Sequence, residues 1–245
     1  MNRIAHLLEQ RGASLDPGEP CPPHWANLAR MLASRYPVFD GIRPRLGYTE
    51  PFAAESPQER QLCETLAQSG FLTRERQSYY RRSDDSRKVR FLTGGWLEHL
   101  AALALEEAGA EAALPSTVLY WKVDEYDGKN EVDVIARRGN RLIFVSCKCL
   151  RAAFDDSQNG AARLRTKLMQ YVLEADDLAD HFGRPGDAVV LVVTTDLIDE
   201  INGDRSRYPA LFGKARALDV ELISLEHLSW GRLLARMKAL LGERS

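Results

Sequence analysis

The second half of the chain alternates between two patterns of apolar residues. Apolar positions at helical spacing predict helices over 94–110, 159–183 and 226–243. Continuous or alternating apolar runs predict strands over 116–123, 130–137, 141–150, 187–195 and 217–225. The order helix, three strands, helix, strand, with a terminal strand and helix, predicts an α/β fold in which helices flank a mixed sheet.

The first 92 residues follow a less regular pattern. Its recognisable segments are short helices at 3–12 and 24–36, a Pro-rich connector at 16–23, an irregular Pro-containing stretch before 57, a capped helix at 57–70 and two β-rich arms around a polar turn at 71–92. A helix followed by a hairpin is typical of part of a winged helix. We therefore expect a small helical and winged-helix-like region over 1–92 and a main domain over 93–245.

Composition limits where the protein is expected to act, but it says little about the reaction. The 33 basic and 35 acidic side chains give a net charge of -2, so any attraction to a polyanion must be local. The longest aliphatic run, 188–193, is too short to span a membrane, and the N-terminus lacks a signal-type apolar block, which predicts a cytoplasmic protein. The four cysteines have no metal-type spacing and are expected to be reduced thiols.

Three charges interrupt the apolar strands at 130–150. Gly139 and Asn140 suit a two-residue hairpin turn, so residues whose numbers sum to 279 should face each other. One face then holds Val132, Val134, Val145 and Cys147. The other face holds Ile135 and Phe144 near the turn and, at its far end, Glu131, Asp133, Ser146 and Lys148.

Charges in such a place cost several kcal/mol each unless they are paired or bind a metal. A Glu131–Lys148 ion pair would explain two of them and leave Asp133 without a role. Carboxylates bind hard divalent cations, and a neighbouring lysine can orient an attacking water and offset phosphorane charge. The grouping therefore favours phosphodiester hydrolysis.

These residues resemble the motif of the PD-(D/E)XK, or restriction-endonuclease-like, nucleases, in which an acidic residue on one strand faces (D/E)-x-K on the next. Asp133 matches the first element and Lys148 the last. The stretches "FLTGGWLEHLAALAL" (91–105) and "NEVDVIARRGNRLIFVSCK" (130–148) look like the nuclease region of CRISPR-associated effectors that join a cyclic-oligoadenylate sensor, the CARF domain, to a nuclease. We extend the similarity over roughly 57–225.

The resemblance implies an α-β-β-β-α-β core and a metal-dependent endonuclease that acts on DNA or RNA, in antiviral CRISPR-associated defence. It implies Mg²⁺ or Mn²⁺ as the cofactor, held by Asp133, by Glu98 and by the backbone carbonyl of Cys147. Relatives of this kind are commonly dimeric, so a homodimer is also expected.

Two departures from the family pattern change these expectations. Ser146 stands where the family has Glu or Asp, so either Glu131 or Glu98 compensates, or the protein is an impaired nuclease that binds nucleic acid without cleaving it. The first 56 residues lack the strands and the length of a sensor domain, so cyclic oligoadenylate binding is not expected within this chain. A third alternative is a partner-binding α/β domain with an internal ion pair.

Two sets of polar residues could contact nucleic acid. Both sets could equally be solvated surfaces. They are Arg81, Arg82, Arg87 and Lys88 around the tyrosines of the predicted hairpin, and Arg163, Lys167 and Gln170 at i, i+4 and i+7 of the helix over 159–183.

Overall fold

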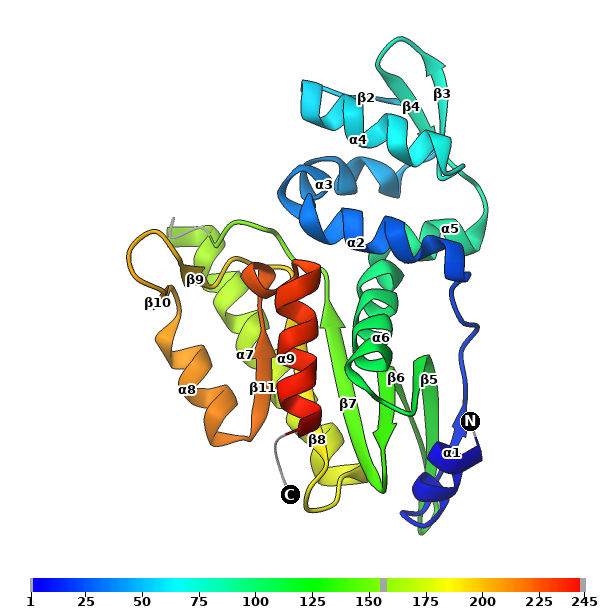
Figure 1. Cartoon of the computed structure of the whole chain (residues 1–245), viewed down its shortest axis with the longest axis vertical. Helices are drawn as coiled ribbons and strands as arrows, with labels where there is room; N and C mark the ends of the chain where they lie inside the picture. The colour runs from blue at the N-terminus through cyan, green and yellow to red at the C-terminus, as the bar shows by residue number, and fades with distance from the viewer. Residues whose placement is uncertain (1, 155–157, 243–245) are drawn as a thin grey trace.

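A six-stranded mixed sheet forms the centre of the molecule (Figure 1). This computed structural model describes residues 2–154 and 158–242. In spatial order the strands are β1 (Ala13–Asp16), β5 (Ala112–Val123), β6 (Tyr126–Arg138), β7 (Arg141–Lys148), β8 (Ala188–Val193) and β11 (Val220–Ile223). The first four pair antiparallel, and β7, β8 and β11 pair parallel. The predicted α/β fold with a mixed sheet is confirmed.

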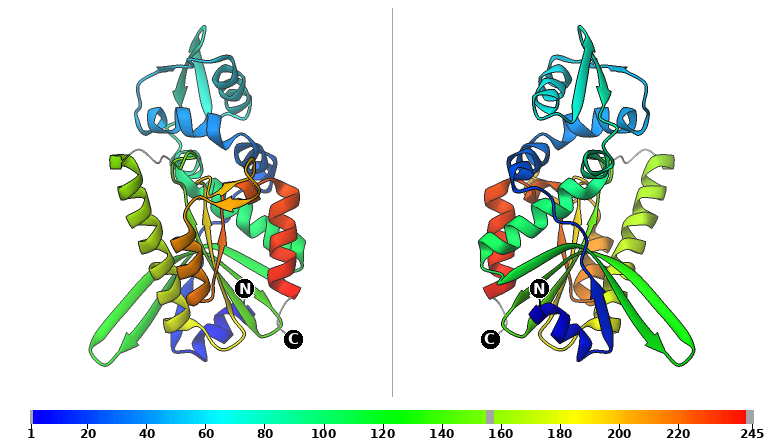
Figure 2. Two further views of the ribbon diagram at one scale, coloured as in Figure 1. Left: turned by 90° about the vertical axis from the view of Figure 1, so that its left-hand side faces the viewer. Right: turned by 90° about the vertical axis from the view of Figure 1, so that its right-hand side faces the viewer.

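Helices cover both faces of this sheet, as the sequence predicted (Figures 1 and 2). On one face lie α6 (Trp96–Ala108) and α9 (Trp230–Gly242), and on the other α7 (Gln158–Phe182) and α8 (Pro209–Ala217). Helix α8 was not predicted from the sequence. The last helix begins later than expected because Leu225–His227 form a 3-10 turn capped by Ser224. The short strands β9 (Ile198–Asp199) and β10 (Arg205–Ser206) form a separate ribbon.

The N-terminal part contributes to the main sheet and also builds a unit above it. Helix α1 (Asn2–Glu9) leads into β1, an edge strand that the sequence reading missed. The upper unit contains η1 (Pro23–Trp25), α2 (Ala26–Ser34), α3 (Tyr36–Ile42), η2 (Arg43–Gly47), α4 (Pro57–Gln68), the three-stranded sheet of β2 (Phe52–Ala53), β4 (Tyr79–Arg82) and β3 (Leu72–Arg76), and α5 (Ser86–Arg90).

Two expectations for this unit were wrong. The second β-rich arm ends at Arg82, and the chain then forms α5, because the Asp85 carboxylate accepts the free amides of Arg87 and Lys88 and caps a helix. The stretch around Pro37 is helical rather than irregular, with this proline at the start of α3, where its missing amide costs nothing.

The upper unit and the sheet share one hydrophobic core. The Trp96 ring of α6 lies 5.5 Å from the Tyr36 ring of α3, and both side chains are fully buried. A π-type turn, η3 (Phe91–Gly95), joins α5 to α6. Strand β7 points toward this unit in Figure 1. The carboxyl edge of the sheet, where β7, β8 and β11 end, therefore faces the upper unit.

The predicted register of the β6–β7 hairpin is confirmed over five pairs. Gly139 has the positive φ, 61°, that the turn requires. The pairs run from Arg138–Arg141 to Val134–Val145, and each sums to 279. Beyond Val134 the ladder with β7 stops, while β7 continues to pair with β8 as far as Lys148.

A distortion in β5 accompanies the end of this ladder. Ser116 has φ 51° and is skipped in the β5–β6 pairing, which runs through Pro115–Val134 and resumes at Thr117–Val132. On β6 the facing also changes at this level: Val132 packs on the α7 face, with Ile135, and not on the face of Val134 as predicted. The outer part of the β5–β6 hairpin extends away from the body (Figure 2).

Candidate active site

Asp133 lies where β6 separates from β7. Here the β7 backbone has no β6 strand partner, and the Asp133 carboxylate takes over this role. Its Oδ2 accepts a hydrogen bond from the Cys147 amide at 2.6 Å. This charge-assisted bond fixes the carboxylate and gives Asp133 a reason to interrupt an apolar strand.

Lys148 ends β7 beside this carboxylate. Its Nζ lies 3.8 Å from Asp133 Oδ2 and 5.3 Å from the centre of the Tyr171 ring on α7. The Lys148 and Asp133 side chains are 27 % and 19 % exposed, so the pair is sheltered but open to solvent. The ammonium group is thus held between a carboxylate and an aromatic face. The structure brings together the two residues that the motif aligned.

The register predicted that Glu131 lies opposite Lys148, where the two could form an ion pair, and this prediction was wrong. Glu131 is exposed and pairs with Arg90 of α5 at 3.2 Å. The β6–β7 ladder ends before position 131, so the register no longer places Glu131 opposite Lys148. Its charge still influences the site, because it helps to raise the pKa of Glu98.

Ser146 is buried, with 7 % of its surface exposed. Its Oγ donates to Asp133 Oδ2 at 3.4 Å, a long contact. A neutral hydroxyl therefore stands beside Asp133, where the family motif would add a second carboxylate.

Glu98 projects from the first turn of α6 and is half-buried. Burial raises the pKa of its carboxyl, a hydrogen bond from Ser116 opposes this shift, and the negative charge of Asp133 adds to it. The Ser116 Oγ donates to Glu98 Oε2 at 2.5 Å. The left-handed residue that interrupts β5 is thus the one that holds Glu98, a role that no sequence pattern indicated.

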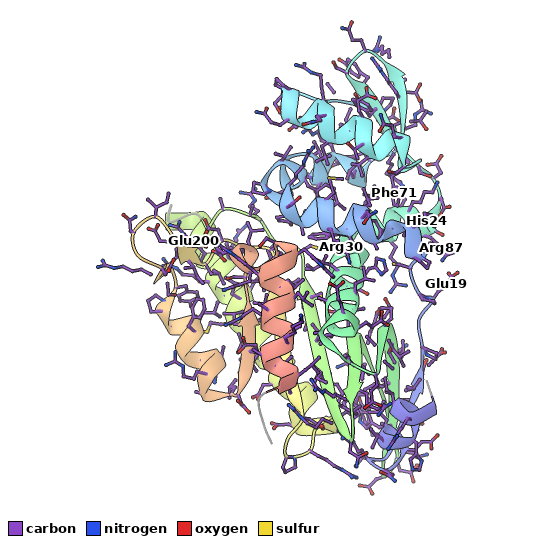
Figure 3. The ribbon with its side chains drawn as sticks, viewed as in Figure 1. Glu19, His24, Arg30, Phe71, Arg87 and Glu200 are labelled. Carbon is purple, nitrogen blue, oxygen red and sulfur yellow. The ribbon has the colours of Figure 1, made fainter. Side chains whose placement is uncertain are left out.

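The Pro-rich connector passes over this corner. Gly18 approaches Ser116 so closely that a Cβ at this position would lie 2.3 Å from the Ser116 carbonyl oxygen. An ion pair between Glu19 and Arg87 of α5, at 3.0 Å, ties the connector to the upper unit, and both residues are labelled in Figure 3. Only glycine can occupy position 18 without moving Ser116.

The donor set suits a cation that retains much of its water. Within residues 2–154 and 158–242, no three His, Cys, Asp or Glu side chains form a ready metal cluster. Asp133 and Glu98 are nevertheless close enough for one negative charge to raise the pKa of the other group. Mg²⁺ is commonly bound by one or two carboxylates together with water and substrate phosphate, so these residues fit such an ion.

Helix α3 and the first residue of η2 hold the loop that follows Lys148 through three hydrogen bonds. Tyr36 Oη donates to the Leu150 carbonyl at 2.6 Å, and Arg43 Nη1 donates to the Cys149 carbonyl at 3.3 Å. The Ala152 amide donates to Asp40 Oδ2 at 2.9 Å. The upper unit therefore shapes the carboxyl edge, which the sequence did not reveal because these contacts span more than 100 residues.

The basic residues of the upper unit that were predicted to contact nucleic acid have partners within the protein. Arg81 pairs with Glu75, Arg82 donates to the Tyr48 carbonyl, and Lys88 donates to the Gly70 carbonyl. On α7, Arg163 and Lys167 are exposed, and Gln170 donates to Glu174. The role of these residues in nucleic-acid binding stays a prediction.

Comparisons with known proteins concern the same part of the chain. Residues 85–168, about a third of the chain, match the family model described as "Card1-like, endonuclease domain". This segment resembles a nuclease. It contains Glu98, Asp133 and Lys148, so the match covers the predicted site, and the resemblance inferred from the motifs is confirmed. No curated protein sequence matches the chain.

Two solved structures share the fold. Protein VC1899 from Vibrio cholerae has a TM-score of 0.65 and 18% identity, covering 97% of this chain and 62% of that one. Can2 from Sulfobacillus thermosulfidooxidans, solved with cyclic tetra-adenylate, has a TM-score of 0.62 and 14% identity, covering 96% of this chain and 61% of that one. The chain thus spans about three fifths of their length. Among the described residues no helix is long and apolar enough to cross a membrane.

Proposed function

We propose that this protein is a divalent-metal-dependent endonuclease that hydrolyses phosphodiester bonds of DNA or RNA. The observation that carries the proposal is the meeting of Asp133 and Lys148 at the separation of β6 and β7. This pair lies inside the segment that matches an endonuclease domain. Its residue types and their shelter from solvent suit phosphoryl chemistry.

Each side chain of the site has a separate role in this proposal. The Lys148 ammonium orients the attacking water and offsets the negative charge that develops on the phosphorane. Asp133 keeps one orientation because the Cys147 amide holds it. The Tyr171 ring limits the movement of Lys148 from the side of α7.

Asp133, Glu98 and the Cys147 carbonyl would hold the Mg²⁺ or Mn²⁺ ion. The ion would supply Lewis-acid polarisation of the phosphate. Support comes from the two carboxylates, which repel each other and would be relieved by a cation. Glu131 adds negative charge nearby and remains tied to Arg90.

The alternative is a nuclease fold that binds nucleic acid without cutting it. The buried Ser146 favours this alternative, because the site carries one carboxylate fewer than the family motif. Salt-sensitive binding without turnover under any divalent ion would support it.

The deciding experiment measures cleavage of single- and double-stranded DNA and RNA with Mg²⁺ or Mn²⁺. Wild-type protein should cleave at least one substrate, and Lys148→Ala and Asp133→Asn should not. Asp127→Asn is the matched control, because Asp127 lies on the same strand as Asp133 and is 81 % exposed. Equal activity in wild-type, Lys148→Ala and Asp133→Asn protein would eliminate the mechanism.

We further propose a role in CRISPR-associated defence, supported by the match to a Card1-like domain and the fold shared with Can2. A homodimer and the lack of cyclic oligoadenylate binding by this chain stay predictions. Light scattering and calorimetric titration with cyclic tetra-adenylate test them.

A further inference from the structure

A groove of about 620 Å³ opens at the carboxyl edge of the sheet. One wall is the loop after β7, which includes Arg151, and the other is α3 with the turn that follows it, which includes Pro37 and Pro44. Its volume lies within the range of ligand-binding pockets. The groove therefore lies at the junction between the upper unit and the loop that continues from Lys148.

Three of the four charged side chains that line the groove have ion-pair partners. Asp40 pairs with Arg43 at 3.2 Å, and Asp196 pairs with Arg207 at 3.2 Å. Arg151 is exposed, and within the part of the chain that the structure describes its side chain has no hydrogen-bond or ion-pair partner. Its guanidinium is thus the charge available to a ligand, and an anion is the ligand that it would attract.

The groove also lies close to the candidate active site. Arg151 is three residues beyond Lys148, and three extended residues span at most about 11 Å. Arg43, in the groove wall, donates to the carbonyl of Cys149, the residue next to Lys148. A strand whose phosphate reached Lys148 could therefore place a neighbouring nucleotide in this groove.

We propose that the groove binds one nucleotide of the substrate strand, adjacent to the bond that is cut. The Arg151 guanidinium contacts the phosphate of that nucleotide, because its planar fork matches two phosphate oxygens. The nucleoside lies along the apolar wall of Pro37 and Pro44. This inference rests on the proposed nuclease function, and it assigns a positioning contact outside the Asp133–Lys148 pair.

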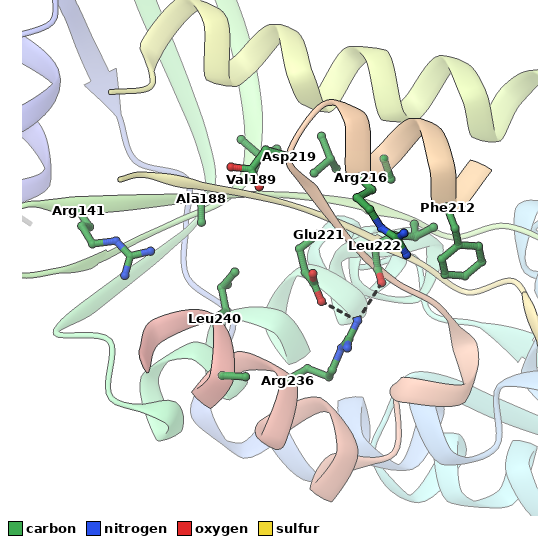
Figure 4. Close-up of a pocket in the computed structure, with 13 residues that line it drawn as sticks. Arg141, Ala188, Val189, Phe212, Arg216, Asp219, Glu221, Leu222, Arg236 and Leu240 are labelled. Carbon is green, nitrogen blue, oxygen red and sulfur yellow. Dashed lines mark hydrogen bonds and ion pairs between the residues drawn. The ribbon is translucent and has the colours of Figure 1, made fainter. Parts of the chain in front are cut away.

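A second pocket provides a matched control. It has a volume of about 380 Å³ and lies at the amino ends of β8 and β11, at the opposite edge of the sheet (Figure 4). There Arg236 is engaged by Glu221 at 2.6 Å, and Arg216 is exposed without a partner among the described residues. Arg216 matches Arg151 in type and exposure but lies far from Lys148 in the fold.

The test measures binding of fluorescein-labelled single-stranded 12-mers of DNA and of RNA in EDTA, by anisotropy, over a series of salt concentrations. Arg151→Ala should weaken binding about 5- to 10-fold and reduce the salt slope by about one phosphate contact. Arg151→Lys should keep the slope and part of the affinity, because it keeps the charge but loses the fork. Arg216→Ala should stay within about two-fold of wild type.

The outcomes separate this inference from the nuclease function. Equal affinities for Arg151→Ala and Arg216→Ala would overturn the subsite, even if Lys148-dependent cleavage is observed. Weaker binding by Arg151→Ala without any cleavage by the wild type would support the subsite and refute the hydrolysis. Wild-type protein that binds neither 12-mer would overturn the subsite, and the cleavage assay on single- and double-stranded substrates then decides the hydrolysis by itself.

Discussion

The carboxyl edge of the main sheet and the β3–β4 hairpin both carry many charges, but they arrange them differently. In the hairpin, Arg81 pairs with Glu75 on the same hairpin, and both side chains are exposed. Such surface pairs contribute about 0–1 kcal/mol to stability. At the carboxyl edge, Asp133 and Lys148 come from different strands, are sheltered, and are held by groups from further elements.

This difference shows which charges are informative. Two of the basic side chains of the hairpin have acidic partners, one on the hairpin itself and one on α4, so their charges need no ligand. A sheltered carboxylate beside a lysine at the end of a strand ladder carries a desolvation cost that its hydrogen bond and ion pair offset. The charges at the carboxyl edge are therefore the better candidates for a functional site, and those of the hairpin are explained by surface ion pairs.

The sharpest test of this comparison removes the charges at the edge. Asp133→Asn or Lys148→Ala should reduce the cleavage rate by about 10³-fold or more, because each removes a group that acts in the transition state. Single-turnover cleavage in Mn²⁺ measures the effect. The same assay on Asp127→Asn should show less than about a two-fold change.

A second test adds charge to the edge. Ser146→Asp places a carboxylate beside Asp133 and should tighten Mn²⁺ binding several-fold, because affinity rises with the number of charged ligands. Without metal the same change should lower the melting temperature, since two carboxylates then repel each other. Calorimetric titration and thermal denaturation measure the two effects. Unchanged Mn²⁺ affinity would show that Ser146 is not the missing ligand position.

A third test concerns pH. Burial and a hydrogen bond to Asp196 raise the pKa of Glu226, which follows β11 at the same edge, to about 7. The folded state thus binds this proton more tightly than the unfolded state, and the free energy of unfolding should fall as pH rises from about 4 to 7. Allowing for partial exposure, the loss is on the order of 1–2 kcal/mol.

Glu226→Gln lacks this titration. The variant should match wild type near pH 4 and melt a few degrees higher at pH 8, as measured by thermal denaturation across that range. Parallel melting curves for the two proteins at all pH values would contradict the shifted pKa.

The smallest effect is expected in the hairpin. Arg81→Ala should change the affinity for a single-stranded 12-mer by less than about two-fold, because Glu75 already neutralises this arginine. Anisotropy titration decides the point, with Arg151→Ala as the comparison. A five-fold loss would move the nucleic-acid interface from the edge to the upper unit.

The order of helical and strand patterns predicted the fold class, and the hairpin register predicted that Asp133 and Lys148 lie close together. Gly139 and Asn140 set the register of a hairpin, and the register places Asp133 near Lys148. The pattern failed where the chain departs from regular geometry. Alternation cannot reveal that Ser116 adopts a left-handed conformation and donates to Glu98, or that Val132 changes face beside it.

Short elements were the other source of error. Strand β1 has four residues, too few for a recognisable alternation, and its pairing with β5 depends on residues 100 positions away. Helix α5 was hidden because its residues suit a strand as well as a helix, and the Asp85 cap decides the outcome. The positions of Tyr171 and Tyr36 at the edge arise from tertiary packing, which a single sequence does not report.

The hydrogen bonds between α3 and the loop after β7 limit how this site could be transferred to another protein. A fragment that starts at residue 93 would retain Asp133 and Lys148, yet the Leu150 carbonyl would lose the Tyr36 hydroxyl and the Ala152 amide would lose the Asp40 carboxylate. It would also present to water the surface of Trp96 that Tyr36 now covers. A graft of β6 and β7 onto another scaffold would therefore need to include α3.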